Sequence, residues 1–320
     1  MKVSIIIPTK NNADTLEKCL QAICNQDFPK DEIEVVIVDG YSKDGTTEIA
    51  KKFGCKVVYE KIGTIGGARN IGVENSTGDY IVFTDADCVP EIDWLKNLIR
   101  EFRDERVASV GGPNITPEDD TEFAKCVGHV LEFLSSFGAR YAFKADKVLE
   151  IYHNPTCNSA YRRKVFEEVG GFNVKLITCD DEELDYRIRK KGYKILFTPY
   201  ARVYHYRRPT WKSFAKMSWK YGIGRGQVIK LGREFIKWYY CTPSALILLI
   251  FLLLALSIAF PIFAFIAISM IVAGSIGIGL IGLYLALKTK KSFLTYSLLI
   301  AIWFWGYGLG MLRGLIKAAR

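Results

Sequence analysis

Two pairs of acidic residues have the types and spacing that metal-assisted and acid–base chemistry require. Asp85 ends an apolar run and Asp87 follows it closely, while Asp180 and Asp181 stand in a cluster of acids. In an Asp-x-Asp after an apolar strand, the alternation of side chains carries both carboxylates to the same side. One carboxylate can then hold a divalent cation while the other meets a sugar hydroxyl. Such oxygen ligands suit Mg²⁺ or Mn²⁺, which keep several waters and bind substrate phosphates as well.

Alternating apolar runs and amphipathic stretches predict the strands and helices that must position these carboxylates. The predicted strands are Val3–Pro8, Ile33–Asp39, Lys56–Tyr59, Tyr80–Asp85 and Val107–Gly111. Asp14 or Thr15 is expected to cap the first helix. The apolar side chains that this helix turns toward the sheet are Leu16, Leu20 and Ile23. The alternation favours an α/β fold with a mostly parallel sheet flanked by helices.

Two of the predicted strands end in aspartates, Asp39 and Asp85. Because ligands of such sheets bind at the carboxyl ends of the strands, we expect these two residues to share one ligand site. Each acid also has an ordinary structural explanation. A strand-ending Asp is often the cap of the next helix, and acids at a helix N-terminus can simply complement the helix macrodipole.

The last 80 residues have a different composition, because no Asp or Glu occurs after residue 240. Trp238–Leu287 contains 50 residues without a charge, whereas one membrane span needs about 20. Pro261 divides this run, so we expect a hairpin of two helices at 243–260 and 262–287. Ser292–Leu312 is a third uncharged run. Its length favours a third crossing, and its glycines and aromatics also suit an interfacial or re-entrant segment.

A basic and aromatic belt precedes the apolar region. Residues 200–240 hold ten basic side chains and one acidic side chain, which suits amphipathic helices on anionic lipid headgroups rather than nucleic acid. The positive-inside rule then predicts a multi-pass protein of the cell membrane with its catalytic domain in the cytoplasm. The expected division is 1–205 for a catalytic domain, 206–242 for an interfacial segment and 243–320 for two or three membrane helices.

The eight cysteines show no metal-binding spacing.

Five segments resemble, in order, the blocks of the family 2 inverting glycosyltransferases with the GT-A fold. They are Val3–Asn12, Val38–Thr46, Gly67–Gly72, Thr77–Asp87 and Asp180–Arg187. The resemblance covers about residues 1–230. It implies a Rossmann-like sheet, a nucleotide-diphosphate sugar as donor, with UDP-sugars favoured, and Mg²⁺ or Mn²⁺ as cofactor. Gly40 departs from the pattern, because many members have a second acid or Asn there.

The resemblance also implies roles for individual residues. Asp39 is similar to the residue that contacts the nucleotide base, and Asp85 and Asp87 are similar to the pair that meets the ribose and the metal. The other residues of the nucleotide-sugar cleft would be Pro8, Arg69 and Asn70. His205 would supply a metal or diphosphate contact. Residues that would meet the acceptor or the diphosphate are Asn158, Arg162 and Arg187, although Arg187 can equally pair with Asp180 or Glu183.

Asp181 resembles the family's general base. An acceptor hydroxyl needs a carboxylate on the ring face opposite the leaving diphosphate, and attack from that face inverts the anomeric centre. We expect the neighbouring acids Asp180, Glu182 and Glu183 to raise the pKa of Asp181. The family's processive synthases carry a Gln-x-x-Arg-Trp block that this chain lacks, whereas Tyr221–Gly226 resembles the segment of non-processive members.

These features predict a membrane-anchored, metal-dependent inverting glycosyltransferase that moves one sugar to a membrane-associated hydroxyl acceptor, such as a lipid-linked glycan. A polyprenyl-phosphate glycosyltransferase is the alternative within the same class. Its phosphate nucleophile is already an anion and needs no base, whereas the Asp180–Asp181 pair favours a hydroxyl acceptor. A nucleotidyltransferase should show a Gly-rich phosphate loop where this chain has Pro8–Asn12. An inactive sugar-binding module is the remaining alternative, and the intact acids argue against it.

Overall fold

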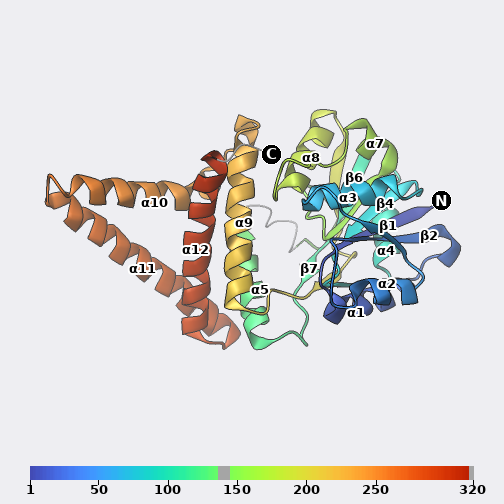
Figure 1. Cartoon of the computed structure of the whole chain (residues 1–320), viewed down its shortest axis with the longest axis horizontal. Helices are drawn as coiled ribbons and strands as arrows, with labels where there is room; N and C mark the ends of the chain where they lie inside the picture. The colour runs from blue at the N-terminus through green and yellow to red at the C-terminus, as the bar shows by residue number, and fades with distance from the viewer. Residues whose placement is uncertain (136–144, 317–320) are drawn as a thin grey trace. The chain divides into compact units, whose positions relative to one another are not determined.

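The computed structural model describes residues 1–135 and 145–316, which form two compact units (Figure 1). Of the described residues, the first unit contains Met1–Glu118 and residues 145–206. The second unit contains residues 119–135 and 207–316. The segments expected at 206–242 and 243–320 both fall in the second unit, apart from Tyr206. Helix α5 (Glu122–Ser135), which we expected in the catalytic domain, belongs to the second unit, because its apolar side chains pack against the C-terminal helices.

An α/β sheet organises the first unit, as predicted. Among the described residues the strand order is β3-β2-β1-β4-β9-β6-β10-β8. The strands are β1 (Val3–Thr9), β2 (Ile33–Asp39), β3 (Lys56–Tyr59), β4 (Tyr80–Thr84), β6 (Val107–Gly111), β8 (Leu149–Glu150), β9 (Asn158–Arg162) and β10 (Lys194–Phe197). Strands β3, β2, β1 and β4 are parallel neighbours, and β6 and β10 form another parallel pair. Strand β9 runs antiparallel between β4 and β6, so the sheet is mostly, and not wholly, parallel.

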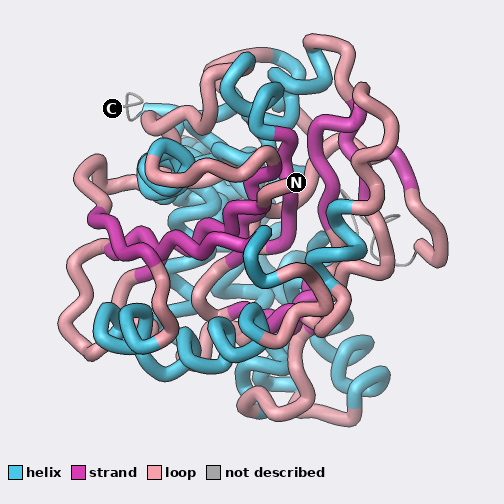
Figure 2. Tube along the Cα trace, turned by 90° about the vertical axis from the view of Figure 1, so that its right-hand side faces the viewer, coloured by secondary structure: helices cyan, strands magenta, loops and turns pink. Residues whose placement is uncertain are grey.

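Helices cover both faces of this sheet (Figure 2). They are α1 (Ala13–Cys24), α2 (Thr46–Lys52), α3 (Ile65–Glu74), α4 (Trp94–Ile99), α7 (Arg163–Glu168) and α8 (Asp180–Lys190). Strand alternation divides the core, because Ile5 and Ile7 pack with α1 and α4, whereas Ile6 packs with α3, α7 and α8. Short 3-10 turns lie at Lys30–Glu32 and Arg233–Phe235.

The expected cap of α1 is wrong. Asn12 is the N-cap residue, and its carbonyl accepts the amides of Thr15 and Leu16. The free amide of Ala13 instead donates to the carboxylate of Asp44, at 3.1 Å, from the loop after β2. A tertiary contact therefore replaces the local cap that the sequence pattern suggested.

A small second sheet orders β5 (Cys88–Pro90), β11 (Val203–His205) and β7 (Asn114–Ile115). Strand β11 pairs antiparallel with β5, and His205 lies directly opposite Cys88 in the register. The end of the Asp85–Asp87 segment is thereby joined to a strand more than 100 residues later in the chain. This pairing positions His205 next to the candidate metal ligand Asp87.

The second unit is helical. Besides α5 it contains α9 (Trp211–Ile229), α10 (Trp238–Leu256), α11 (Ile262–Thr289) and α12 (Phe293–Ile316). Helices α10, α11 and α12 are each long and apolar enough to cross a membrane. The predicted hairpin is present, with α10 and α11 meeting near Pro261. In Figure 1, α10 and α11 extend away from α9 and α12 at a large angle to the axes of those two helices.

Helices α9 and α12 run side by side and parallel, joined by a seam of small residues. Small residues repeat every four positions on both helices and face one another. They are Ser218, Gly222 and Gly226 of α9 and Gly306, Gly310 and Gly314 of α12. Small residues at this spacing let helix backbones approach closely. A Cβ at Gly222 would lie 2.1 Å from the carbonyl oxygen of Tyr307, so only glycine fits there.

Adding one methyl group to this seam should destabilise the second unit. We expect Gly222→Ala to lower the free energy of unfolding by about 1–3 kcal/mol relative to Gly274→Ala, because overpacking costs that much. Gly274 of α11 has nothing within 4 Å of an added Cβ, and both variants gain the same helix propensity. Thermal unfolding of both variants in detergent measures the difference, and equal midpoints would contradict close packing at the seam.

Candidate active site

The carboxyl ends of neighbouring strands carry the predicted nucleotide-binding residues. Asp39 ends β2 and Asp85 follows β4, with β1 between these strands. Pro8 is buried in β1 opposite Val38. Asp39 is 1% exposed, and its two carboxylate oxygens accept hydrogen bonds from the hydroxyl and the amide of Ser42. The loop after β2 therefore holds this carboxylate in one orientation at the expected edge of the sheet.

Arg69 connects this sheet edge to the acidic helix α8. It is buried on α3, and its guanidinium lies 2.9 Å from Asp180 and 3.9 Å from Asp85. Burial raises the pKa values of both carboxyl groups to about 6, although Arg69 counteracts this shift. Burial would lower the pKa of Arg69, but the acids around it raise the pKa above its ordinary value, so the cation is retained. A fixed positive charge thus lies between two acids at the candidate site.

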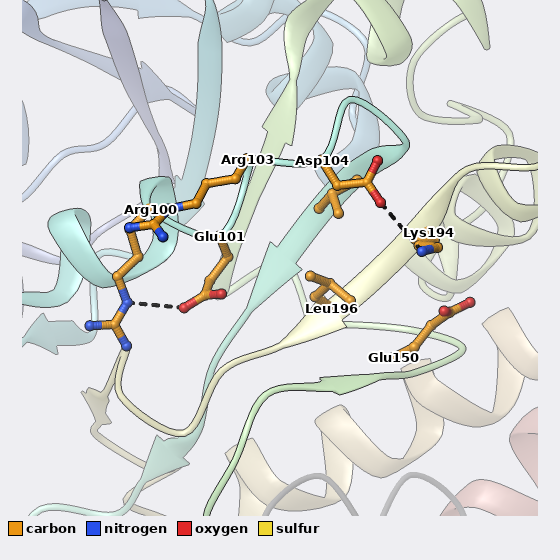
Figure 3. Close-up of a pocket in the computed structure, with 8 residues that line it drawn as sticks. Arg100, Glu101, Arg103, Asp104, Glu150, Lys194 and Leu196 are labelled. Carbon is orange, nitrogen blue, oxygen red and sulfur yellow. Dashed lines mark hydrogen bonds and ion pairs between the residues drawn. The ribbon is translucent and has the colours of Figure 1, made fainter.

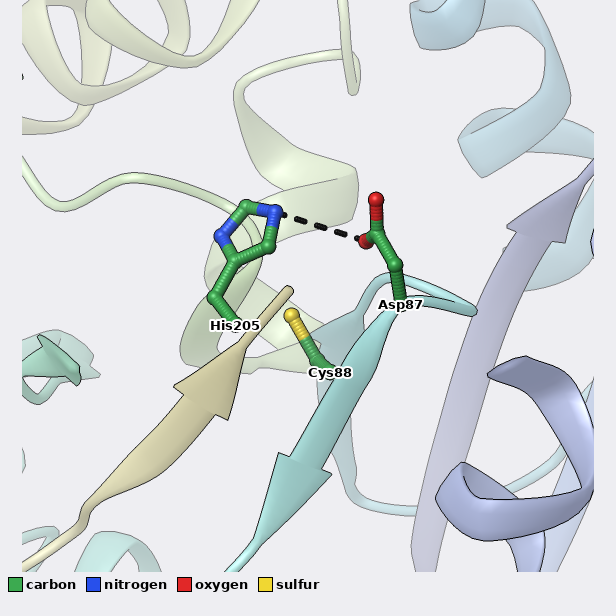
Figure 4. Close-up of side chains that lie close together, drawn as sticks. All are labelled: Asp87, Cys88 and His205. Carbon is green, nitrogen blue, oxygen red and sulfur yellow. Dashed lines mark ion pairs between the residues drawn. The ribbon is translucent and has the colours of Figure 1, made fainter. Parts of the chain in front are cut away.

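Asp87 and His205 form a candidate metal site. His205 Nε2 lies 3.4 Å from Asp87 Oδ1, and the Cys88 sulfur is part of the same cluster, whose ligand atoms lie within 4.8 Å of one another (Figure 4). Burial, followed by the nearby Cys157, raises the pKa of the Cys88 thiol far above its ordinary value, and cations such as Mg²⁺ and Mn²⁺ prefer oxygen ligands to sulfur. A carboxylate oxygen and an imidazole nitrogen remain as donors. This donor set fits Mn²⁺ or Mg²⁺, which fill their other positions with waters and phosphate oxygens.

Asp181 lies in the first turn of α8, behind the left-handed residue Cys179. Its side chain is 21% exposed, and its oxygens accept bonds from the Glu182 amide at 2.9 Å and the Thr156 hydroxyl at 3.4 Å. The expectation of a raised pKa is wrong. Burial raises the pKa of Asp181, but the nearby His153 and Arg69 cations and hydrogen bonds from the backbone amides of Glu182 and Thr156 lower it below its ordinary value. The positive partners outweigh the like charges that the sequence emphasised.

Two residues beside Asp181 were assigned no role from the sequence, although both lie in segments that resemble the family. His153 Nδ1 lies 3.1 Å from the carboxylate of Asp185, and its Nε2 lies 4.0 Å from Asp181. The spacing of Asp181 and Asp185, one helical turn apart, was a usable signal that they share a face. His153 begins the segment 153–162, whose resemblance to the family's acceptor side pointed to Asn158 and Arg162 rather than to this residue.

Four residues that were predicted to contact the donor or the acceptor lie outside this cluster. Asn158 is fully buried, and its amide bonds to Trp94, Pro113 and Ala201. Arg162 lies at the opposite end of β9 and donates to the carbonyls of Phe102 and Val107. Arg187 pairs with Glu183 at 2.8 Å, which is the alternative that the sequence left open. Asn70 braces the backbone of Phe172 through both amide atoms. All four stabilise the domain in this structure.

A cavity of about 470 Å³ lies elsewhere, at the amino ends of β6 and β10 (Figure 3). Its charges largely neutralise one another, because Arg100 pairs with Glu101 and Lys194 pairs with Asp104. None of the predicted site residues lines it. Ligands of such sheets bind at the opposite, carboxyl end, so this cavity is not the candidate active site.

Comparison with known proteins identifies the family. The family model "Glycosyl transferase family 2" matches residues 4–170. The dolichyl N-acetyl-alpha-D-glucosaminyl phosphate 3-beta-D-2,3-diacetamido-2,3-dideoxy-beta-D-glucuronosyltransferase of Methanococcus voltae is 31% identical over 74% of this chain and 77% of its own length. Glycosyltransferase AglE of Haloferax volcanii is 32% identical over 71% of this chain and 73% of its own length.

Solved structures share the fold. A mannosyltransferase of Pyrobaculum calidifontis in complex with GDP-Man and Mn²⁺ has a TM-score of 0.67 at 21% identity, over 97% of this chain and 87% of that one. Staphylococcus aureus TarS in complex with UDP-GlcNAc has a TM-score of 0.53 at 21% identity, over 72% and 67% of the two chains. With its GT-A sheet and the matching family model, this chain belongs to glycosyl transferase family 2 and is a glycosyltransferase.

Proposed function

We propose that this protein is a metal-dependent inverting glycosyltransferase that moves one sugar from a nucleotide-diphosphate donor to a hydroxyl group of a lipid-linked acceptor. The observation that carries the proposal is a connected set of side chains in one unit. The Asp87–His205 pair stands at one side, and Arg69 links Asp85 to Asp180, the neighbour of the ionised and accessible Asp181. Such a set can hold a diphosphate and a base around one sugar ring.

On the donor side, Asp39 would hold the nucleotide base and Asp85 the ribose. Asp87 and His205 would hold Mn²⁺ or Mg²⁺, which neutralises the negative charge that develops on the leaving diphosphate. The buried Arg69 cation fixes the positions of two carboxylates. Its guanidinium lies 2.9 Å from Asp180 and 3.9 Å from Asp85. A side chain that is already held in place adds no reorganisation cost during the reaction.

On the acceptor side, Asp181 would take the proton of the attacking hydroxyl. The acceptor oxygen forms a bond to the anomeric carbon while the bond from that carbon to the diphosphate breaks, and the bonding electrons leave with the diphosphate. The depressed pKa of Asp181 keeps it ionised at neutral pH, in the form that can accept the proton. Attack opposite the leaving group inverts the anomeric configuration.

The names of similar proteins support the substrate classes. The Methanococcus relative is named for an acceptor in which a sugar is already attached to dolichyl phosphate, which supports a hydroxyl acceptor on a lipid carrier. Solved relatives contain GDP-Man or UDP-GlcNAc. We propose a UDP-sugar as donor on the basis of Asp39 and its surroundings.

For the membrane region we propose that α10 and α11 cross the bilayer and that α9 and α12 lie together in the interface. Helix α9 exposes Lys212, Lys216 and Lys220. Because α12 is packed along α9 and parallel to it, a crossing α12 would bring these lysines toward the hydrocarbon, at about 2.5–3.5 kcal/mol for each charge near the centre. The lower mean hydropathy of α12, 1.4 against 2.2 and 2.3, agrees with an interfacial position. The sequence had favoured three crossings.

This topology predicts that the C-terminus lies on the cytoplasmic side with the catalytic domain, in agreement with the positive-inside rule. A site-specific protease sequence added after Arg320 should be cleaved only after the membrane is opened. The same sequence inserted at Ser257–Pro261, between α10 and α11, should be cleaved from outside in intact spheroplasts. Cleavage of the C-terminal site in intact spheroplasts would establish a third crossing.

The decisive experiment presents the full-length protein with UDP-, GDP- and TDP-sugars and Mn²⁺. The acceptors are polyprenyl phosphate and a polyprenyl-phosphate-linked sugar. We expect transfer to a hydroxyl of the linked sugar, with an anomeric configuration opposite to that of the donor. Transfer to bare polyprenyl phosphate alone would establish the alternative acceptor class, and nucleotide binding without any transfer would favour an inactive module.

A further inference from the structure

His153 lies between two carboxylates of α8 that share one helix face. Its Nδ1 is 3.1 Å from Asp185 Oδ2, and its Nε2 is 4.0 Å from Asp181 Oδ2. Asp181 and Asp185 are four residues apart, so their side chains project in the same direction. A ring with one nitrogen toward each acid can connect a buried carboxylate to the candidate catalytic base.

Asp185 is built as a rigid anchor for this imidazole. Its side chain is completely buried, and the Asn154 amide donates to Oδ2 at 2.9 Å while the Tyr161 hydroxyl donates to Oδ1 at 3.1 Å. A buried carboxylate that already has two partners holds its geometry, because losing any of them would leave an unpaired polar group. The bond to His153 Nδ1 therefore fixes the ring orientation and keeps a proton on Nδ1.

The charges around His153 favour the imidazolium form. Burial alone would lower its pKa, but Asp181, Asp185 and Glu182 of α8 raise the pKa to about 9. Asp181 in turn faces the cation of Arg69 from α3 and interacts with the acid Asp180, and Tyr161 of β9 contacts Asp185. One cation between two carboxylates allows both to remain ionised in a site where desolvation would otherwise protonate one of them.

We propose that His153 is a positioning residue for the base: Asp185 holds the imidazolium, and the imidazolium holds Asp181 as an oriented carboxylate ready for the acceptor. This inference rests on the proposed role of Asp181 in glycosyl transfer. His153 keeps its own protons throughout, and the proton of the acceptor goes to Asp181. Nothing in this arrangement requires contact between His153 and the donor.

The pH profile of His153→Gln in the full-length enzyme tests the proposal. Because an opposite charge at this range lowers a carboxyl pKa by about 1–3 units, its loss should move the acidic limb of kcat/KM upward by about one pH unit or more. Activity relative to wild type should then fall progressively below about pH 5, toward a deficit of about tenfold at a pH below both pKa values, and should change little between pH 7 and pH 8. The KM for the donor should stay unchanged. A loss of activity that is equal at every pH would overturn the proposal, because it would indicate a merely structural role.

Asp185→Asn provides a second variant that keeps the volume and a hydrogen-bond acceptor but removes the anchoring charge. In this variant the pKa of His153 should fall, because one of the carboxylates that raise it has lost its charge. The matched control is His129→Gln in the second unit, where the ring contacts the hydroxyl of Tyr296 at 2.7 Å, and its acidic limb should coincide with that of wild type. A His153 pKa in Asp185→Asn that coincides with that of wild type would contradict the anchoring role.

Imidazole NMR tests the proposal without any transfer assay. The chain has three histidines, so variants at each position assign the signals. His153 should remain protonated at pH 8 in the wild type and should titrate near its ordinary pKa in Asp181→Asn. Titration of wild-type His153 at or below about 6.5, the ordinary value, would overturn the proposal. If the protein transfers no sugar while His153 behaves as expected, the proposed function fails and the interaction with Asp181 stands.

Discussion

Asp181→Asn should reduce turnover by about 10²–10⁴-fold, the range that general-base catalysis contributes, while donor binding remains nearly intact. The amide keeps the size of the side chain and an oxygen for the Thr156 hydroxyl, 3.4 Å away. It cannot take the proton of an acceptor hydroxyl. Steady-state transfer to the lipid-linked sugar, together with nucleotide binding at equilibrium, separates the two effects.

Asp31→Asn is the matched control, because Asp31 is exposed in the turn before β2 and lies outside the site. It should transfer at the wild-type rate. Full activity of Asp181→Asn on a hydroxyl acceptor would show that another group is the base. If full activity were confined to polyprenyl phosphate, the acceptor would be the phosphate, whose nucleophile is already an anion.

Asp87→Ala should abolish metal-dependent binding of the nucleotide. The carboxylate is one of two donors in the candidate site, and the remaining imidazole of His205 is not expected to hold Mn²⁺ by itself. We expect a loss of affinity greater than the roughly 10–100-fold caused by mutating an outer partner of a metal ligand. Calorimetric titration of UDP with and without Mn²⁺ measures the loss.

Asp27→Ala is the control for this variant, because Asp27 is an exposed acid that pairs with Lys96 on the surface. Its nucleotide affinity should match that of wild type with Mn²⁺ and without it. Unchanged Mn²⁺-dependent affinity in Asp87→Ala would mean that the metal is held elsewhere, and the assignment of the Asp87–His205 pair would fail.

Local patterns predicted the central strands well because burial on both faces leaves a continuous apolar signal. Strands β2, β3 and β6 have the predicted bounds, and β1 and β4 differ by one residue. The predicted cap of α1 was wrong because the acceptor of the Ala13 amide is Asp44, which lies in a different loop and cannot be recognised from the sequence around Ala13. Arg162 was expected at the acceptor or the diphosphate, but the antiparallel course of β9 carries it away from the ligand edge.

The sequence by itself determined the acids at the strand ends, the acidic start of α8 and three apolar helices, since each depends on residues close together in the chain. Only the tertiary structure decided which partners these residues meet. Arg69 reaches Asp180 across 111 residues, and His153 reaches Asp181 from a separate loop. The sign of the Asp181 pKa shift follows from those partners, because the nearby cations outweigh the acids beside it. Electrostatic interactions depend on distance in space, and a sequence shows only distance along the chain.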